Sequence, residues 1–165
     1  MINILKKKLP ESELTEVLDN LLQQAMMMNK TKAGTLQLLN KNTHTLELVT
    51  SSGLSPEFID HFKTVTIDDG SVCGRALENG ETVFIKDLTK DAAFARHLNL
   101  ALQNNIVAVQ STPLISSNGL IVGMISTHFS SPRKMTKNNF EKFASFCLEA
   151  ADKIEELIAE QTSSK

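Results

Sequence analysis

The chain has 165 residues, of which 41% are hydrophobic and 22% are charged, and a formal net charge of −2. These values predict a single globular domain, and the small net charge and the absence of Trp and Tyr argue against a nucleic-acid-binding surface. No apolar run approaches the roughly 20 residues of a membrane-spanning helix, no signal-peptide pattern is present and two cysteines make no disulfide framework, so we expect a cytoplasmic protein.

The first helix is predicted to extend from Ser12, its N-terminal cap, to Met28. Residues 1–11, with the basic run Lys6–Lys8, are expected to be a solvated tail. The three methionines at 26–28 are typical either of core packing or of an adaptable binding surface. The apolar stripe of this helix is predicted to consist of Leu14, Leu18, Leu21, Ala25 and Met28.

A hairpin is predicted next, with strands at 35–40 and 45–51 in which leucines alternate with polar residues. Ser55 and Pro56 are typical of the start of a short helix, and residues 64–67 are predicted to form a short strand.

The middle of the chain is predicted to be mainly helical. Ser71 caps a helix that ends at a glycine, and a short strand at 82–85 follows. Another helix is expected to open at Thr89 or Asp91 and to end near Gln103. Its inner face is predicted to carry Phe94, Leu98, Ala101 and Leu102.

The clearest local pattern is a hairpin with strands at 107–115 and 120–129, joined by a polar turn at 116–119. Buried polar groups need hydrogen-bond partners, and a cavity that holds water or a ligand is one way to supply them. The hairpin therefore favours a ligand-sensing module. Its apolar strands are interrupted by Gln110, Ser111, Thr112, Ser126, Thr127 and His128.

Alternation along the second strand assigns its side chains to two faces. The more apolar set is expected to meet the helices and consists of Ile121, Ile125, Thr127 and Phe129. The other set is expected to face a pocket, with Met124, Ser126 and His128 in this strand and Val109 and Ser111 in the preceding one.

Thr136 is predicted to cap the last helix, whose apolar residues form a seam with alternating spacings of three and four. The first half of the seam is expected to pack on the chain's own sheet and first helix, and the part beyond about Ala151 on a partner helix. The seam consists of Phe140, Phe143, Cys147, Ala150, Ile154 and Leu157. The order of elements predicts an α+β domain at 12–158, followed by a tail at 159–165.

Five segments follow one another in an order that is typical of a known domain family: Gly70–Leu77, Thr82–Asp87, Val109–Leu114, Gly119–Gly123 and Ser126–Phe129. Together they resemble the GAF domain, most closely the GAF domains of bacterial sensor histidine kinases and two-component proteins. The resemblance covers about residues 13–158. It implies a PAS-related central antiparallel sheet of five or six strands, with terminal helices on one face and a small-molecule pocket, with short helices, on the other.

Members of that family bind cyclic nucleotides, tetrapyrroles, haem or small metabolites, and many bind nothing known. They commonly dimerise through their terminal helices and signal along the last one. The candidate ligand-binding residues of this chain are Cys73, Arg75, Phe94, Val109, Ser111, Ser126 and His128.

Several candidates also have a purely structural interpretation. His128 is typical of a strand-end histidine that hydrogen-bonds to backbone or water, and Cys73 of a small buried hydrophobe. Arg75 is expected to pair either with an anionic ligand or with Asp87. Of Arg96 and His97, one is expected to face outward.

Catalysis has little support in the sequence, which lacks nucleophile-elbow, P-loop and metal-ligand spacings. Free methionine-sulfoxide reductases of the family use cysteines, and Cys73 resembles one of them. Residues 95–105 hold no second thiol, and the pocket strands lack the substrate-binding acids. The signatures for cyclic-nucleotide binding and bilin attachment are incomplete too. We therefore expect no enzyme, no metal and a ligand of unknown identity.

The resulting hypothesis is a sensory domain that binds a small molecule, forms a homodimer and acts on a separate signalling protein. One alternative is an interaction module with a vestigial pocket, in which the seam at 140–157 is the working surface. The other alternative is an enzyme similar to the free methionine-sulfoxide reductases. The sequence leaves open the ligand, the output partner, the dimer geometry and whether the chain is a fragment of a larger sensor.

Overall fold

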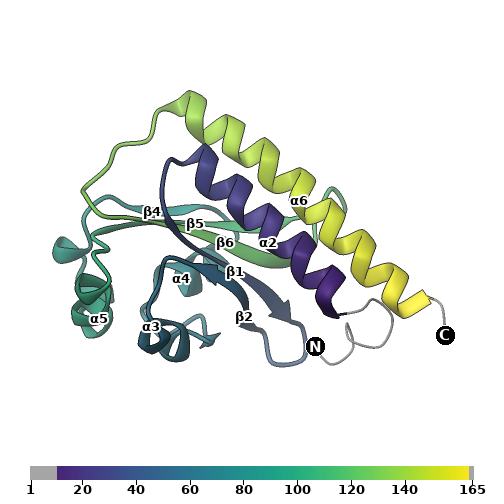
Figure 1. The fold of residues 1–165 in the computed structure, drawn as a ribbon, viewed down its shortest axis with the longest axis horizontal. Helices are drawn as coiled ribbons and strands as arrows, with labels where there is room; N and C mark the ends of the chain where they lie inside the picture. The colour runs from purple at the N-terminus through teal and green to yellow at the C-terminus, as the bar shows by residue number, and fades with distance from the viewer. Residues whose placement is uncertain (1–10, 164–165) are drawn as a thin grey trace.

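A computed structural model describes residues 11–163, so residues 1–10 of the predicted tail at 1–11 lie outside the described residues. Figure 1 shows two long helices on one face of a sheet and the short helices on the other. In chain order the elements are α2 (Glu11–Met28), β1 (Ala33–Asn40), β2 (Thr45–Ser52), α3 (Pro56–His61), β3 (Thr64–Val65), α4 (Val72–Asn79), β4 (Val83–Ile85), the 3-10 helices η1 (Leu88–Lys90) and η2 (Ala92–His97), α5 (Leu98–Gln103), β5 (Ala108–Ile115), β6 (Ile121–Phe129) and α6 (Lys137–Ser163).

The six strands form one sheet in the order β3-β2-β1-β6-β5-β4, and every neighbouring pair is antiparallel. The long strands β1, β6 and β5 occupy the centre, while β3 and β4 are the short edges. This arrangement confirms the predicted α+β fold, including the terminal helices on one face. Within residues 11–163 we find no helix with the length and apolarity that crossing a bilayer requires.

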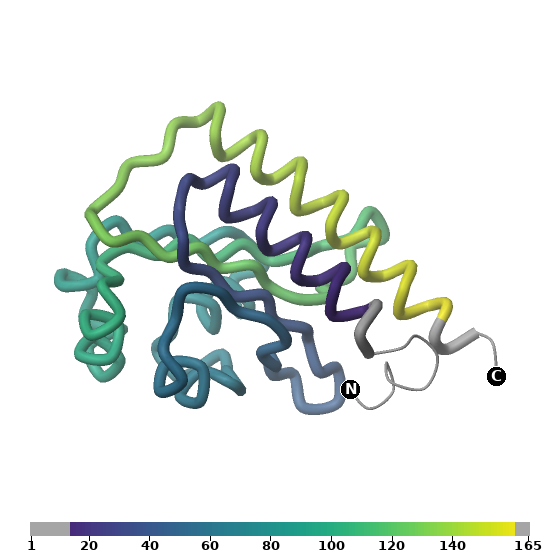
Figure 2. Tube along the Cα trace, in the orientation of Figure 1, coloured from purple at the N-terminus to yellow at the C-terminus, as the bar shows by residue number. Residues whose placement is uncertain are grey.

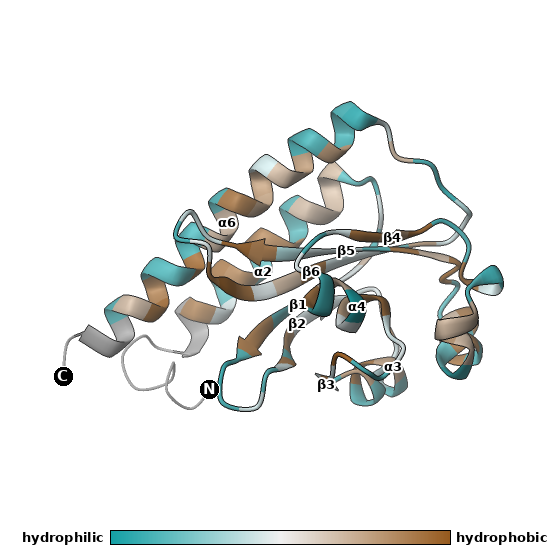
Figure 3. Ribbon diagram, turned by 180° about the vertical axis from the view of Figure 1, so that it is seen from behind, coloured by the Kyte–Doolittle hydropathy of each residue, from teal (hydrophilic) through white to brown (hydrophobic). Residues whose placement is uncertain are grey.

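The first core lies between the sheet and the antiparallel pair α2 and α6, which Figure 2 shows side by side. Figure 3 shows hydrophobic residues gathered where these helices meet the sheet. On α2 the buried stripe differs from the predicted one, because Leu22 and Met26 are buried while Met28 is 42% exposed. The helix also begins at Glu11, so Ser12 lies inside it and is not its cap.

The second half of α6 also packs on this core. Ile154 is 2% exposed and Leu157 is 9% exposed, and both belong to the cluster that α2 and the sheet complete. The prediction that the seam beyond Ala151 meets a partner helix is therefore wrong. It failed because α2 extends along the sheet far enough to cover the second half of α6. Thr136 caps the helix as predicted, since its Oγ1 accepts a hydrogen bond from the Asn139 amide at 3.1 Å.

The second core lies on the other face, under α3, α4, η2 and α5. The caps predicted for two of these helices are present: the Ser55 side chain accepts from the Phe58 amide and that of Ser71 from the Gly74 amide. The single helix predicted from about residue 90 to Gln103 is instead two 3-10 turns followed by α5. Leu102, predicted to lie inside, is 42% exposed.

A β-bulge at the start of β6 corrects one assignment of faces. The register shifts between Leu114 and Ile115 of β5. Leu114 pairs with Gly123 and Ile115 pairs with Ile121, so Val122 is the extra residue of the bulge. As a result Val122 packs on the helix-pair core, and Ile121 packs on the opposite core. The predicted place of Ile121 beside Ile125 is therefore wrong, whereas simple alternation holds after the bulge.

Candidate functional site

The floor of the candidate site is the pocket-side face of the three central strands. Thr35 in β1, Ser126 in β6 and Ser111 in β5 are register partners and form a row of hydroxyl groups across the sheet. The Ser111 and Ser126 hydroxyl oxygens lie 2.7 Å apart in a buried hydrogen bond. Gln37, Val109 and His128 complete the floor.

The walls come from the short helices of the second core. Three aromatic side chains close the cavity: Phe58 of α3, Phe62 just after it, and Phe94 of η2. The Phe58 ring stands edge-on to the His128 ring, with centroids 5.6 Å apart. The remaining wall residues are Ser71, Val72, Cys73, Ala101 and Ile106.

The volume of the cavity is about 30 Å³. A cavity of this size holds one or two water molecules, whereas small-molecule pockets usually measure hundreds of cubic ångströms. Wall and floor meet where the Phe58 ring faces His128 and where Cys73 contacts Gln37.

Two polar atoms in the floor lack a hydrogen-bond partner among the described residues, Gln37 Oε1 and His128 Nδ1. Both side chains are nearly buried, with 2% and 6% of their residue surface exposed. A buried polar atom without a partner costs about 1–3 kcal/mol. The floor therefore presents hydrogen-bonding capacity that the protein itself does not use.

Burial lowers the pKa of His128 to about 4, although a backbone hydrogen bond with Ala33 acts in the opposite direction. The ring is therefore neutral at neutral pH, with one nitrogen as donor and the other as acceptor. A neutral imidazole suits a polar, uncharged contact better than an ion pair.

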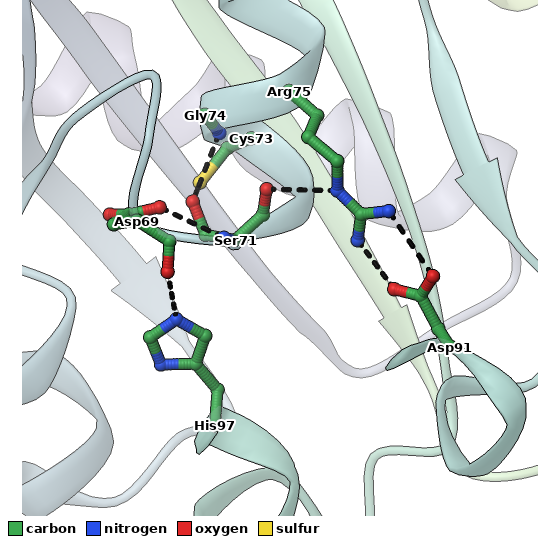
Figure 4. Close-up of polar contacts among 7 residues, drawn as sticks. All are labelled: Asp69, Ser71, Cys73, Gly74, Arg75, Asp91 and His97. Atoms are coloured by element: carbon green, nitrogen blue, oxygen red, sulfur yellow. Dashed lines mark hydrogen bonds and ion pairs between the residues drawn. The ribbon is translucent and has the colours of Figure 1, made fainter. Parts of the chain in front are cut away.

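Cys73 stands in the first turn of α4 and contacts the floor. Gln37 Nε2 lies 3.7 Å from its sulfur, and the thiol lies 3.6 Å from Ser71 Oγ. Burial raises the pKa of the Cys73 thiol and the nearby Asp69 raises it further, while the hydrogen bonds with Ser71 and Gln37 act in the opposite direction. At neutral pH it is a thiol and not the reactive thiolate. Figure 4 shows the turn that holds it, where Asp69 Oδ1 accepts from the Ser71 amide.

Arg75 does not line the cavity. Its Nη1 and Nη2 donate to the two carboxylate oxygens of Asp91, at 3.2 and 2.6 Å, and its Nε donates to the Ser71 carbonyl. Figure 4 shows the side chain extending to Asp91 and away from His97. The predicted ion pair exists, but its partner is Asp91 and not Asp87.

Two histidines meet at the outer side of the wall, a contact that the sequence did not predict. His61 Nε2 lies 2.9 Å from His97 Nδ1, and His97 Nε2 lies 2.7 Å from the Asp69 carbonyl oxygen. The carbonyl fixes a proton on His97 Nε2, so His97 Nδ1 accepts from His61. Burial lowers the pKa of His97. Of the adjacent pair Arg96 and His97, it is Arg96 that faces outward.

Half of the polar residues that interrupt β5 and β6 make their contacts on the face of the sheet opposite the cavity. Asn29, which follows α2, donates from Nδ2 to Thr127 Oγ1 at 3.0 Å and to Gln110 Oε1 at 3.5 Å. Thr112 accepts from Thr82. Only Ser111, Ser126 and His128 face the cavity.

Six of the seven predicted site residues, all but Arg75, therefore line one cavity, and whether they bind a ligand stays a prediction. Sequence reasoning missed Thr35 and Gln37, because polar residues alternating with Leu36 and Leu38 are also typical of a solvent-facing strand side. It also missed Phe58 and Phe62, since nothing local distinguishes wall aromatics from core aromatics. Within residues 11–163 no group of three or more His, Cys, Asp or Glu is arranged to hold a metal ion.

Comparison with solved structures shows the same fold in proteins of low sequence identity. A domain assigned to a two-component sensor histidine kinase protein from Sinorhizobium meliloti is 18% identical, with a TM-score of 0.71 over 88% of this chain and 92% of that one. The blue-light-absorbing form of the PixJ GAF domain from Thermosynechococcus elongatus is 17% identical, with a TM-score of 0.64 over 94% of each chain. A type II free methionine-R-sulfoxide reductase from Thermoplasma acidophilum is 16% identical, with a TM-score of 0.68 over 91% of this chain and 95% of that one.

A search of curated proteins finds no match to this sequence. The family model described as GAF domain matches residues 11–155, which is most of the chain and includes every wall and floor residue of the cavity. With the sheet order and the two-faced core described above, this match identifies the chain as a member of the GAF domain family.

Proposed function

We propose that this GAF domain is a non-catalytic sensory domain that binds a small molecule between its sheet and its short helices. The observation that carries the proposal is the pair of buried, unpartnered atoms Gln37 Oε1 and His128 Nδ1 in the cavity floor. A ligand that donates a hydrogen bond to Gln37 Oε1 and forms a hydrogen bond with His128 Nδ1 removes the free-energy cost of leaving these two atoms without partners. The aromatic wall supplies apolar contact for the rest of the molecule.

Because the cavity is small, binding of a ligand requires the wall helices to move away from the floor. The floor belongs to a continuous sheet, while the wall consists of short helices joined by side-chain contacts. A ligand that fits only when the wall moves outward would select the open conformation and shift the population toward it. Binding would then change the positions of α3, α4 and η2 relative to the sheet.

The proposed output is a change in a homodimer formed through the terminal helices. Two apolar side chains on these helices are accessible to such a contact, since Met27 of α2 is 77% exposed and Leu148 of α6 is 44% exposed. The likeness to the sensor histidine kinase domain and to the light-absorbing PixJ domain supports a sensory role. A separate signalling partner and a cytoplasmic location stay predictions.

A second candidate function is an interaction module whose cavity no longer binds anything. The cavity volume of about 30 Å³ favours it, because such a cavity is nearly filled by the protein's own side chains. Multi-angle light scattering tests this version directly. A monomer at every concentration would rule out a module that works through dimerisation and would also remove the proposed output of the sensor.

The arrangement of the two thiols argues against a reductase of the methionine-sulfoxide type. Cys73 contacts the cavity, while Cys147 is buried in the helix-pair core on the other face of the sheet. Two thiols separated by the sheet cannot form the internal disulfide of a thiol-based cycle without unfolding. We expect no turnover in an NADPH-coupled assay on free methionine sulfoxide; turnover that disappears in Cys73→Ser would contradict this expectation.

A thermal-shift screen of a metabolite library tests ligand binding. We expect at least one compound to raise the Tm of the wild type, and expect the rise to disappear in Ser111→Val, which removes a floor hydroxyl and fills the cavity. Thr112→Val is the matched control, because Thr112 is the next residue of the same strand and does not line the cavity. A screen without hits, or a hit that survives in Ser111→Val, would refute the proposal.

A further inference from the structure

A second hollow lies at the edge of the sheet, away from the cavity and its ligand. It is a groove of about 540 Å³ between the segment that contains β4 and η1 and the segment that leads into α6. Phe84, Ile85 and Met135 provide its apolar surface. The Phe84 ring contacts Phe129 and Phe140, with centroids 6.5 and 6.2 Å away, so the groove adjoins the beginning of α6.

The groove is lined by cations from both of its sides. Lys86 and Lys90 come from the first segment, and Arg133 and Lys134 from the second. No ion pair involving any of the four occurs in the described part of the chain. A concentration of positive charge in a hollow is notable in a chain whose net charge is −2.

The two acidic residues of the groove are already engaged. The carboxylate of Asp91 forms the ion pair with Arg75. The carboxylate of Asp87 accepts hydrogen bonds from the amide and the hydroxyl of Thr89, which together with nearby Lys90 lower the pKa of Asp87. The groove is therefore electropositive, and Lys86 and Lys134 are available to an anionic partner. The Arg133 guanidinium lies over the Phe129 ring, with Cζ 4.4 Å from the ring centroid, and adds its charge from that position.

The groove also adjoins an unpaired strand edge, which Figure 3 shows as the hydrophobic strand β4 at the margin of the sheet. β4 pairs with β5 on one side, and no described segment pairs with its other side. An open edge offers backbone N–H and C=O groups to an added strand. If two copies of the chain paired edge to edge through β4, Lys86 and the neighbouring cations of one copy would lie against those of the other. Like charges directly opposite each other are unfavourable. The charges thus disfavour pairing with itself and favour an acidic strand.

We propose that this groove binds an acidic segment of a partner protein, which lies extended along β4 with its carboxylates against Lys86, Arg133 and Lys134. The three features required of such a site coincide here: open backbone edge, apolar floor and uncompensated positive charge. A segment bound there would contact both β4 and the residues that lead into α6. This places a partner beside the helix on which the output is proposed to depend, without involving the ligand cavity.

The test uses a fluorescein-labelled peptide of alternating Glu and Val, measured by fluorescence anisotropy against the full chain. We expect saturable binding that weakens as salt screens the charges, and amide NMR shifts centred on residues 83–86. The control is a proline peptide of the same net charge, with Pro at two adjacent interior positions, so that whichever of its edges meets β4 has lost a backbone donor. We expect it to bind at least ten-fold more weakly.

Charge reversal separates this site from general attraction to positive charge. We expect Lys86→Glu/Lys134→Glu to weaken binding of the Glu–Val peptide at least ten-fold, and Lys86→Gln/Lys134→Gln to weaken it less. The control, Lys41→Glu/Lys153→Glu, makes the same change in net charge at two exposed residues outside the groove and should leave binding within two-fold. Thermal melts verify that each variant folds.

The proposal would be overturned by no binding of the Glu–Val peptide, by equal binding of the proline peptide, or by equal weakening in the control variant. Tighter binding of an oligothymidylate to the same residues would overturn it too, since the groove would then recognise nucleic acid.

Discussion

At the scale of single residues, the cavity floor combines satisfied and unsatisfied polar groups in one small area. The Ser111–Ser126 hydrogen bond satisfies two hydroxyls, whereas Gln37 Oε1 and His128 Nδ1 have no partner in the described chain. Natural interiors seldom leave such atoms unpaired, so each one calls for an explanation. Alternation had indicated which residues of β5 and β6 face the cavity, but not which of their atoms remain free, because that depends on neighbours from β1 and α4.

The buried His128 predicts a specific dependence of stability on pH. Its folded pKa of about 4 lies below the ordinary value of 6.5, so the unfolded chain binds more protons between these two values. The free energy of unfolding therefore falls as pH decreases from about 6.5 to 4, by roughly 3 kcal/mol from this residue alone. Urea unfolding at pH 7 and pH 4.5 measures the fall.

Replacing the imidazole isolates its contribution from that of the carboxylates. His128→Gln should reduce the loss of stability between pH 7 and pH 4.5, whereas His44→Asn, in an exposed turn, should leave it unchanged. An identical pH dependence in His128→Gln and the wild type would show that His128 is accessible to protons in the folded state.

At the scale of elements, the central strands approach each other so closely that one position requires glycine. A Cβ at Gly123 would lie 2.2 Å from the Gln37 carbonyl oxygen of β1. Because that oxygen belongs to the backbone of the central sheet, it cannot move aside as a flexible side chain would. The same region contains the bulge that reverses the faces of Ile121 and Val122.

Gly123→Ala should therefore lower the free energy of unfolding by roughly 3 kcal/mol, through strain between β6 and β1. Gly119→Ala is the control, because a Cβ there meets nothing within 4 Å and only the positive φ of 79° is unfavourable. That strain costs about 1–2 kcal/mol. Equal losses in the two variants, measured by urea unfolding, would show that β1 and β6 separate to admit the methyl group.

The second half of α6 provides a prediction about folding of the single chain. Ile154→Ala should lower the free energy of unfolding by about 2–4 kcal/mol at protein concentrations where the chain is monomeric, because Ile154 is buried against the chain's own core. Lys153→Ala, at an exposed position of the same helix, should change it by less than about 0.5 kcal/mol. A loss for Ile154→Ala that appears only in a dimer would restore the partner-helix interpretation.

Local sequence patterns predicted most of these elements, because caps and alternation are local properties. The Ser55, Ser71 and Thr136 caps lie where their spacing indicated. Two of the features that were missed are non-local: the reach of α2 over α6 and the His61–His97 contact depend on segments far apart in the chain, for which one sequence carries no signal. The bulge at Val122 lies within one hairpin and depends on how its two strands pair.

At the scale of the whole molecule, the sheet separates two functions that we propose for the domain. The face covered by α2 and α6 is proposed to form the dimer and to transmit the signal, while the other face encloses the cavity. The edge at β4 provides a third surface, with its own charge and its own partner. A change at the cavity would reach the helices only through the sheet, whose central strands contribute to both cores.

The central claim is that the cavity floor binds a small molecule, and NMR of that floor tests it most directly. With metabolites added to isotope-labelled protein, we predict that at least one compound shifts the His128 ring and Gln37 side-chain amide resonances together, saturably, with no effect in Ser111→Val. A library that leaves both resonances unmoved, while the Ser111→Val variant is folded and indistinguishable from wild type in every titration, would contradict the account.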